Sequence, residues 1–201
     1  MSQPTLHSNK FQHSASQSLI VSDMLIKIAT VEPIEFVDLT DHINQHLRQS
    51  NIREGSVTVF SRHTTAAIKI NEAEELLMED FKYFLKRLCP VGHGYHHNDM
   101  GRRKPPIAPD ERPNAHSHLM HLLLSTSETI PVIDSRLALG TWQRVFMIEL
   151  DGPRSREVMV RCHSYLPHGV PIAIETKRNG VGKANGHHHA SNGDAEFTNG
   201  K

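Results

Sequence analysis

Strand-like segments stand near both ends of the foldable part of this chain, and the longest helix-like segments lie between them. Alternating and β-branched runs predict strands at residues 19–28, 34–37, 56–61, 66–70, 129–133, 143–150, 157–162 and 171–175. A parallel sheet needs a long crossover, usually a helix, between successive strands, and this sequence does not show that alternation. We therefore predict a single α+β domain with a mainly antiparallel sheet and flanking helices.

Three helices are predicted from the spacing of their apolar residues. They cover residues 41–50, 73–88 and 114–124. Asn71 and Glu72 stand just before the second helix, where polar side chains can cap its free backbone N–H groups. We expect these two residues to cap the start of that helix.

Charge and composition restrict the class of protein. With 22 basic and 22 acidic side chains among 201 residues, no strong field attracts nucleic acid or an anionic membrane. No apolar run approaches the ~18 residues of a membrane span, and the polar N-terminal segment does not resemble a secretory signal. The two cysteines have no metal or redox spacing and suit a reducing compartment. We expect a cytoplasmic protein that binds a small molecule, without nucleic-acid or membrane partners.

The two ends of the chain differ in composition from the middle. Residues 1–17 and 179–201 are rich in Ser, Gly, Asn, Gln and His and show no apolar periodicity. Segments of this kind do not bury enough apolar surface to fold. We predict a folded domain over residues 18–178 between two disordered tails.

Histidines gather in the middle third of the chain. His116 and His118 stand two residues apart, and His97 lies in a long loop over residues 91–113. Imidazole titrates near neutral pH and is a common ligand of transition metals. Three imidazoles with an open coordination position would make a site suited to metal catalysis. A surface helix with scattered histidines is an equally good interpretation of the segment that holds His116 and His118.

Four other residues could carry chemistry. His63, at the corner between two predicted strands, can act as a base or a ligand, or can bond the backbone of a turn. Glu72 follows the second of these strands and can serve as an acid/base carboxylate. Arg154 can hold a phosphate with its planar guanidinium, pair with Asp151 or face solvent. Trp142, the only tryptophan, can pack in the core or line a pocket.

Four stretches together resemble the YjbQ-like family, the secondary thiamine-phosphate synthase enzymes. They are His63-Thr64-Thr65-Ala66-Ala67-Ile68-Lys69-Ile70-Asn71-Glu72, His97-Asn98, Asn114-Ala115-His116-Ser117-His118-Leu119, and Leu137-Ala138-Leu139-Gly140-Thr141-Trp142-Gln143 continuing to Glu149-Leu150-Asp151-Gly152-Pro153-Arg154. The resemblance covers about residues 18–161. Its most specific part is the Leu-Gly-Thr-Trp-Gln run that leads to Asp-Gly-Pro-Arg. The segment 102–112 is longer than in many members of that family.

The resemblance implies a β-sandwich-like sheet, a homotrimer and a site around shared histidines. Those histidines are His63, His97 and His118. A divalent metal ion, zinc or magnesium, is expected on His97 and His118, with His116 as a lower-ranked third ligand.

Catalytic and substrate-binding roles are assigned to residues of the same four stretches. We assign catalysis to His63, Glu72 and Arg154. Substrate binding is assigned to the polar and aromatic residues Thr64, Asn71, Asn98, Asn114, Trp142 and Gln143.

By this resemblance the protein is a transferase that joins a hydroxymethylpyrimidine diphosphate to a thiazole phosphate and releases pyrophosphate. Such chemistry needs a cation beside the departing diphosphate and an aromatic-lined pocket for the rings. Two alternatives stay open, because a shared fold does not by itself determine function. One is a metal-dependent hydrolase of a small phosphate ester or related metabolite. The other is a non-enzymatic trimeric protein that binds a metal or a small anion.

Overall fold

The computed structural model describes residues 18–108 and 111–166. The predicted tails, the predicted strand at 171–175 and the end of the predicted domain lie outside these residues and stay predictions. Within the described residues, no helix is long and apolar enough to cross a membrane.

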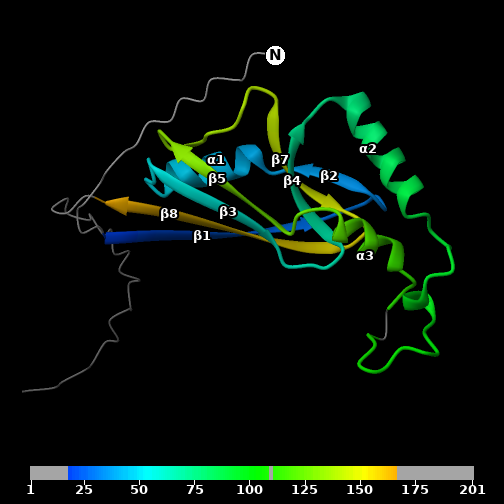
Figure 1. Ribbon diagram of the computed structural model, residues 1–201. Coiled ribbons are helices and arrows are strands. Elements are labelled where there is room, and N and C mark those ends of the chain that lie inside the picture. The colour runs from blue at the N-terminus through cyan, green and yellow to red at the C-terminus, as the bar shows by residue number, and fades with distance from the viewer. Residues whose placement is uncertain (1–17, 109–110, 167–201) are drawn as a thin grey trace, which may run out of the picture. The chain divides into compact units, whose positions relative to one another are not determined.

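The strands form two antiparallel sheets (Figure 1). One sheet has the strand order β1-β8-β3-β5-β6 and the other has the order β2-β7-β4. The strands are β1 (Ser18–Ala29), β2 (Glu35–Asp38), β3 (Gly55–Ser61), β4 (Ala66–Glu72), β5 (Ser127–Ile133), β6 (Arg136–Leu137), β7 (Gln143–Glu149) and β8 (Ser155–Leu166). All neighbouring strands pair in antiparallel fashion, so the predicted α+β class is confirmed.

The main hydrophobic core is shared by the two sheets. Val59 of β3 pairs with Val160 of β8 in the larger sheet, and Ile68 of β4 pairs with Met147 of β7 in the smaller one. All four side chains are fully buried in one cluster. The alternation of each strand therefore directs one face of each sheet toward the other, as in a β-sandwich.

Strand β7 is buried on both of its faces. Val145 and Met147 belong to the main core, whereas Phe146 and Ile148 belong to a second apolar cluster on the opposite face. Between Val145 and Ile148 the strand has no solvent-facing position, so this part of its sequence is a continuous apolar run instead of an alternating one.

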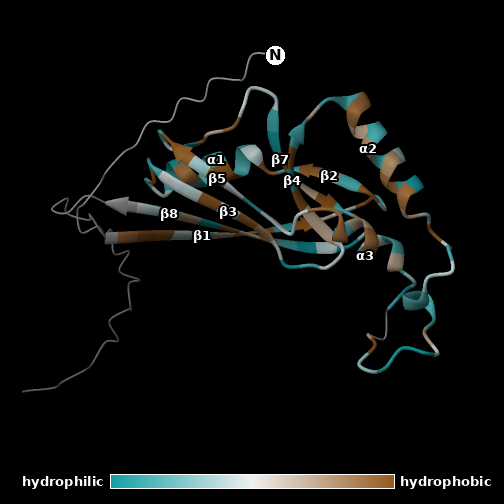
Figure 2. Ribbon diagram, viewed as in Figure 1, coloured by the Kyte–Doolittle hydropathy of each residue, from teal (hydrophilic) through white to brown (hydrophobic). Residues whose placement is uncertain are grey.

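Helices complete both clusters. They are α1 (Thr40–Gln49), α2 (Glu75–Leu88), α3 (Ala115–Leu122) and the 3-10 turn η1 (His96–Asn98). Ile43 and Leu47 of α1 are buried in the main core, while Leu85 of α2 and Met120 of α3 belong to the second cluster. Figure 2 shows hydrophobic and hydrophilic residues alternating along α2, as an amphipathic helix requires.

The predicted start of α2 is wrong by two residues. Asn71 and Glu72 belong to β4, because the pairing of this strand with β7 continues as far as Glu72 opposite Gln143. The helix is capped by Glu74, whose carboxylate accepts hydrogen bonds from the two N–H groups at positions 76 and 77, at 3.0 and 2.7 Å. The ladder hydrogen bonds of β4 thus extend the strand past the residues expected to cap the helix.

A buried ion pair joins the end of β7 to the start of β8. Glu149 is fully buried and Arg156 is 4% exposed. The guanidinium of Arg156 donates two hydrogen bonds to the carboxylate of Glu149, one from Nε to Oε2 at 2.6 Å and one from Nη2 to Oε1. Burial by itself would raise the pKa of Glu149, but the hydrogen bond and the positive charge of Arg156 outweigh it and lower that pKa. Glu149 is therefore charged at neutral pH.

This ion pair also binds the neighbouring segments. Thr30, which follows β1, donates its hydroxyl to Glu149 Oε2 at 2.9 Å. Arg156 Nη2 donates to Thr65 Oγ1, in the corner between β3 and β4, at 3.0 Å. The N–H of Asp151 donates to Glu149 Oε1 at 2.8 Å. Four separate segments of the chain therefore meet at one pair of charges.

Replacing Glu149 by Gln should lower the free energy of unfolding by about 3–5 kcal/mol, because it leaves the Arg156 charge buried without its counterion. Urea denaturation measures this loss. The matched control is Asp23→Asn, which breaks the exposed Asp23–Arg161 pair on the same strand β8, with oxygen–nitrogen distances of 2.8 and 2.7 Å. Since exposed pairs contribute little, equal losses in the two variants would contradict a central role for the buried pair.

His63 fastens the β3–β4 corner to β8. Its Nε2 accepts a hydrogen bond from the N–H of Glu157 at 2.8 Å, so the ring proton is assigned to Nδ1. Burial and the positive charge of Arg156 lower the pKa of His63 from its ordinary 6.5, against the opposing charges of Glu149 and Glu157. The neutral imidazole is the form that can accept this hydrogen bond.

The contribution of His63 to stability should depend on pH. Its pKa is lower in the folded chain than in the unfolded one, so below about pH 6.5 the unfolded chain binds more protons. The contribution is complete above that pH and is lost as the pH falls through the lowered pKa. We expect the difference in unfolding free energy between wild type and His63→Gln to shrink between about pH 7.5 and about pH 5.5. A difference that grows toward acid pH would show the opposite pKa shift.

Candidate active site

A polar pocket lies where β7 passes into β8, beside α3. Its volume is about 260 Å³. The segments that form it come from the β3–β4 corner, η1, the loop after η1, the start of α3 and the turn before β8. The lining residues are Thr64, Thr65, His97, Arg103, Glu111, Asn114, His118, Asp151, Arg154 and Arg156.

Two imidazoles stand side by side in this pocket. The ring centroids of His97 and His118 are 4.9 Å apart, and the ring planes meet at 75°. Asn98, next to His97, accepts a hydrogen bond from the N–H of Ala115 at the start of α3, at 3.0 Å. This bond holds η1 against α3. In the part of the chain that the structure describes, the buried Nε2 atom of His97 has no hydrogen-bond partner.

Burial keeps the histidines of α3 neutral. It lowers the pKa of His118, and the adjacent His97 lowers it further, while Asp151 and Glu111 act in the opposite direction. Burial likewise lowers the pKa of His116, whose Nδ1 lacks a hydrogen-bond partner among the described residues. A neutral imidazole can accept a proton or bind a metal, so the predicted chemistry suits His118.

Asp151 organises the other side of the pocket. Its carboxylate accepts hydrogen bonds from Arg154 Nε at 2.9 Å, from Arg112 Nε at 3.1 Å and from Asn114 Nδ2 at 3.0 Å. Two guanidiniums thus share one carboxylate, which leaves an excess of one positive charge. The arrangement suits an anionic ligand, because planar guanidiniums match the oxygens of phosphate or carboxylate.

Asn114 presents an acceptor beside these charges. Its side chain is buried, and within the described residues its Oδ1 has no hydrogen-bond partner. A buried carbonyl oxygen without a partner carries a cost in free energy. A ligand that donates a hydrogen bond to Oδ1 would remove this cost.

Four of the predicted site residues lie away from this pocket. In the β4–β7 ladder, Ala66 stands opposite Glu149 at the pocket, whereas Glu72 stands opposite Gln143 at the far end. The six residues between them correspond to roughly 20 Å along a strand. Asn71 and Trp142 are neighbours of that far end, and Trp142 is 70% exposed. Within one chain, these residues do not contribute to the site around His97 and His118.

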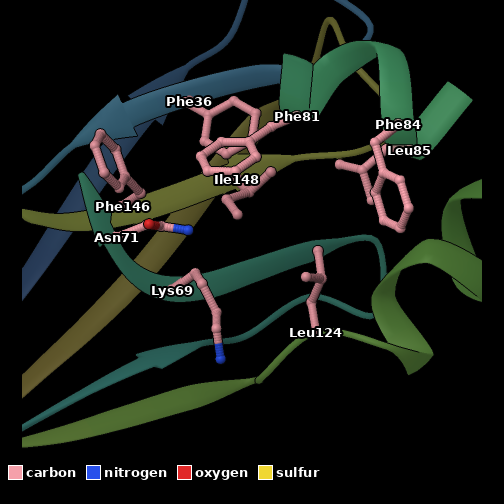
Figure 3. A pocket seen from close by; sticks show the side chains of 9 residues that line it. All are labelled: Phe36, Lys69, Asn71, Phe81, Phe84, Leu85, Leu124, Phe146 and Ile148. Atoms are coloured by element: carbon pink, nitrogen blue, oxygen red, sulfur yellow. The ribbon is translucent and has the colours of Figure 1, made fainter. Parts of the chain in front are cut away.

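A second, apolar pocket of about 180 Å³ lies beneath α2 (Figure 3). Phe36 stacks on Phe81 with 5.8 Å between centroids and meets Phe146 edge-on at 6.0 Å. Asn71 and Lys69 are its polar lining residues, and the ammonium of Lys69 already contacts Ser125 and Glu128. Among the described residues, none lines both this pocket and the polar one. The apolar pocket therefore has room for a ring but offers little chemistry.

His63 and Arg154 have partners that the sequence left open. His63 lines a separate pocket together with Arg156 and Glu157, and it bonds backbone as described above. Arg154 both pairs with Asp151 and lines the polar pocket. Thr64 lines the polar pocket as well.

Sequence reasoning missed several residues of the pocket. Arg103 and Glu111 come from the long loop and line the pocket, and Arg112 of the same loop binds the lining residue Asp151. The basic and acidic character of these residues was visible in the sequence, but their partners were not. Thr65 and Arg156 reach the pocket through the buried ion pair. No local pattern signals the Arg112–Asp151 and Arg156–Thr65 contacts, because these partners are 39 and 91 residues apart in the chain.

The three-histidine metal site stays a prediction. Over residues 18–108 and 111–166, no group of three or more His, Cys, Asp or Glu side chains is arranged to hold a metal ion. The chain brings two imidazoles together, those of His97 and His118, and these do not make a complete ligand set by themselves.

Comparison with known proteins agrees with this fold. The chain is 41% identical over 135 residues to a UPF0047 protein of Methanothermobacter thermautotrophicus, and the match covers 67% of this chain and 87% of that protein. It is 38% identical over 138 residues to one from Archaeoglobus fulgidus, covering 69% and 98%. The crystal structure of a YbjQ-like protein of unknown function from Sulfolobus solfataricus superimposes with a TM-score of 0.65 at 34% identity, covering 73% and 99%.

A family model described as UPF0047 protein YjbQ-like matches residues 24–164, which include most of both sheets and all the lining residues of the polar pocket. Together with relatives more than 30% identical over two thirds of the chain, this match shows that the protein belongs to the YjbQ-like UPF0047 family.

Proposed function

We propose that the polar pocket is the active site of an enzyme that acts on a small phosphorylated metabolite. One observation carries the proposal: a pair of imidazoles, one of them with a buried unpaired nitrogen in the described structure, stands beside two guanidiniums that share one carboxylate. Neutral imidazoles transfer protons, and guanidiniums stabilise the negative charge of phosphate.

Each group has a distinct role in this proposal. Arg154 and Arg112 bind the phosphate of the substrate, in place of part of their contact with Asp151. His118 accepts or donates a proton at the reacting centre, since its lowered pKa leaves it neutral at physiological pH. His97 orients His118 through the contact of their rings.

The resemblance to secondary thiamine-phosphate synthases supports transfer as the reaction. In that reaction the bond between the pyrimidine methylene carbon and the diphosphate oxygen breaks. The thiazole nitrogen forms a bond to the same carbon, and pyrophosphate leaves with the bonding electrons. Guanidiniums beside the departing diphosphate would stabilise its charge without any further reactant.

Hydrolysis of a phosphate ester is the second candidate. It is favoured by the neutral His118, which can take a proton from an attacking water molecule. A protein that binds an anion without turnover is the third, and the two guanidiniums that share the Asp151 carboxylate would suit it equally.

A divalent metal ion is proposed from the resemblance alone. His97 and His118 would be two of its ligands, which would take the place of proton transfer by His118, and imidazole favours zinc over magnesium. Elemental analysis of the wild-type protein beside His97→Ala and His118→Ala tests this proposal independently of activity. Among the described residues, these two imidazoles do not complete a metal ligand set.

The activity test compares two assays on the full chain. One follows formation of thiamine phosphate from the pyrimidine diphosphate and thiazole phosphate, and the other follows release of phosphate from small esters. In whichever assay turns over, His118→Asn should lower kcat by about 100-fold or more. Arg154→Gln should mainly raise KM, by about tenfold, because it weakens phosphate binding.

The matched control is His42→Asn, which removes an exposed imidazole on α1, away from the pocket lining. Its kinetics should equal those of wild type. Turnover that survives His118→Asn unchanged would reject the pocket as the active site, and absence of turnover in both assays would favour the binding protein.

We also propose, from the resemblance, that the protein is a homotrimer. Large apolar side chains on two helices support an interface: Phe84 of α2 is 60% exposed, and Leu122 of α3 is 77% exposed. Light scattering coupled to size-exclusion chromatography should give three times the chain mass of 22.7 kDa. A monomeric mass at micromolar concentration would contradict the proposal.

A further inference from the structure

The loop after η1 brings one internal ion pair into the polar pocket. Arg103 Nη1 donates to Glu111 Oε1 at 2.9 Å, and both side chains are 21% exposed. Both residues line the pocket. The carboxylate of Glu111 is therefore bound to the guanidinium of Arg103, which a ligand in the pocket can reach.

Glu111 is held less firmly than the other two carboxylates at this site. Glu149 is buried and accepts hydrogen bonds from the side chains of Thr30 and Arg156 and from the N–H of Asp151. Asp151 accepts from two arginines and an asparagine. Within the described part of the chain, Glu111 has Arg103 as its single side-chain hydrogen-bond partner.

The three guanidiniums of this region are divided between two carboxylates. Arg112 and Arg154 both bind Asp151, whereas Arg103 binds Glu111. A ligand with one anionic group can be bound by the first pair alone. A ligand with two anionic groups can also use Arg103, provided that it replaces the carboxylate of Glu111.

We infer that Glu111 is a specificity-determining residue: it competes with a ligand for Arg103, so that Arg103 and Glu111 form a second anion subsite that selects ligands with two anionic groups. The inference rests on the proposed function for the identity of the site. The chemical basis is the match between a planar guanidinium and the paired oxygens of a phosphate. Removing the competing carboxylate frees a donor and adds one net positive charge to the pocket.

The test measures binding of inorganic pyrophosphate and of orthophosphate to the full chain by calorimetry, at constant ionic strength. Glu111→Gln should tighten pyrophosphate binding by about tenfold. Arg103→Gln should weaken it by about tenfold. Orthophosphate, which has a single phosphate group, should change much less in both variants.

Two further variants separate the ion pair from general charge. Arg102→Gln is the matched control, because Arg102 is the adjacent residue and its side chain is 71% exposed. It should leave both affinities close to wild type. Arg103→Lys keeps the charge but removes the planar fork, so pyrophosphate binding should fall between those of wild type and Arg103→Gln. If Arg103→Gln does not fold, Glu111→Gln and Arg103→Lys still decide the question.

The outcomes separate this inference from the proposed function. Unchanged or weaker pyrophosphate binding in Glu111→Gln overturns the inference, and so does a wild-type protein that binds no pyrophosphate. Absence of turnover combined with the expected order of affinities rejects the proposed enzyme but keeps the anion subsite. Turnover that depends on His118, without tighter pyrophosphate binding in Glu111→Gln, rejects the anion subsite but keeps the proposed enzyme.

Discussion

The buried ion pair of Glu149 and Arg156 is the interaction on which the rest of this structure depends. Two charges removed from water are tolerated only when every remaining donor and acceptor finds a partner. Here those partners come from the segment after β1, from the β3–β4 corner and from the turn before β8. Satisfying one pair of charges therefore fixes where these segments meet, and the polar pocket is formed at that meeting point.

The same turn carries both stability and the proposed chemistry. Glu149 ends β7 and Arg156 lies in β8, while Asp151 and Arg154 lie between them. The first two residues neutralise each other in the interior. Asp151 and Arg154 lie at the pocket, where Arg112 joins them and the positive charge exceeds the negative. The neutral, buried pair of Glu149 and Arg156 thus fixes the turn that carries Asp151 and Arg154. The net positive charge of that turn and Arg112 suits the binding of an anion.

Much of the fold could be predicted because strand and helix patterns are local. The alternation of β3 and β8 and the apolar spacing of α1 each report a single buried face. The start of α2 could not be predicted from the same kind of pattern, since the ladder with β7 decides how far β4 extends. Of the residues predicted for the site, His97, His118 and Asn114 line one pocket, whereas Glu72 and Gln143 lie at the far end of the β4–β7 ladder. Their roles stay predictions.

The sequence by itself determined the fold class, most element positions and the residue types available for chemistry, because these follow from periodicity and composition within short windows. Tertiary structure alone decided which polar residues meet. In the extended strand β4, Ala66 and Glu72 lie at opposite ends of the ladder with β7, although both belong to one short stretch of the sequence. Arg103 and Glu111 of the long loop line the same pocket as residues of α3 and of the β7–β8 turn, although the composition of the loop does not indicate this position. Contacts of this kind depend on burial and hydrogen bonding across the whole domain, which no local pattern of residues records.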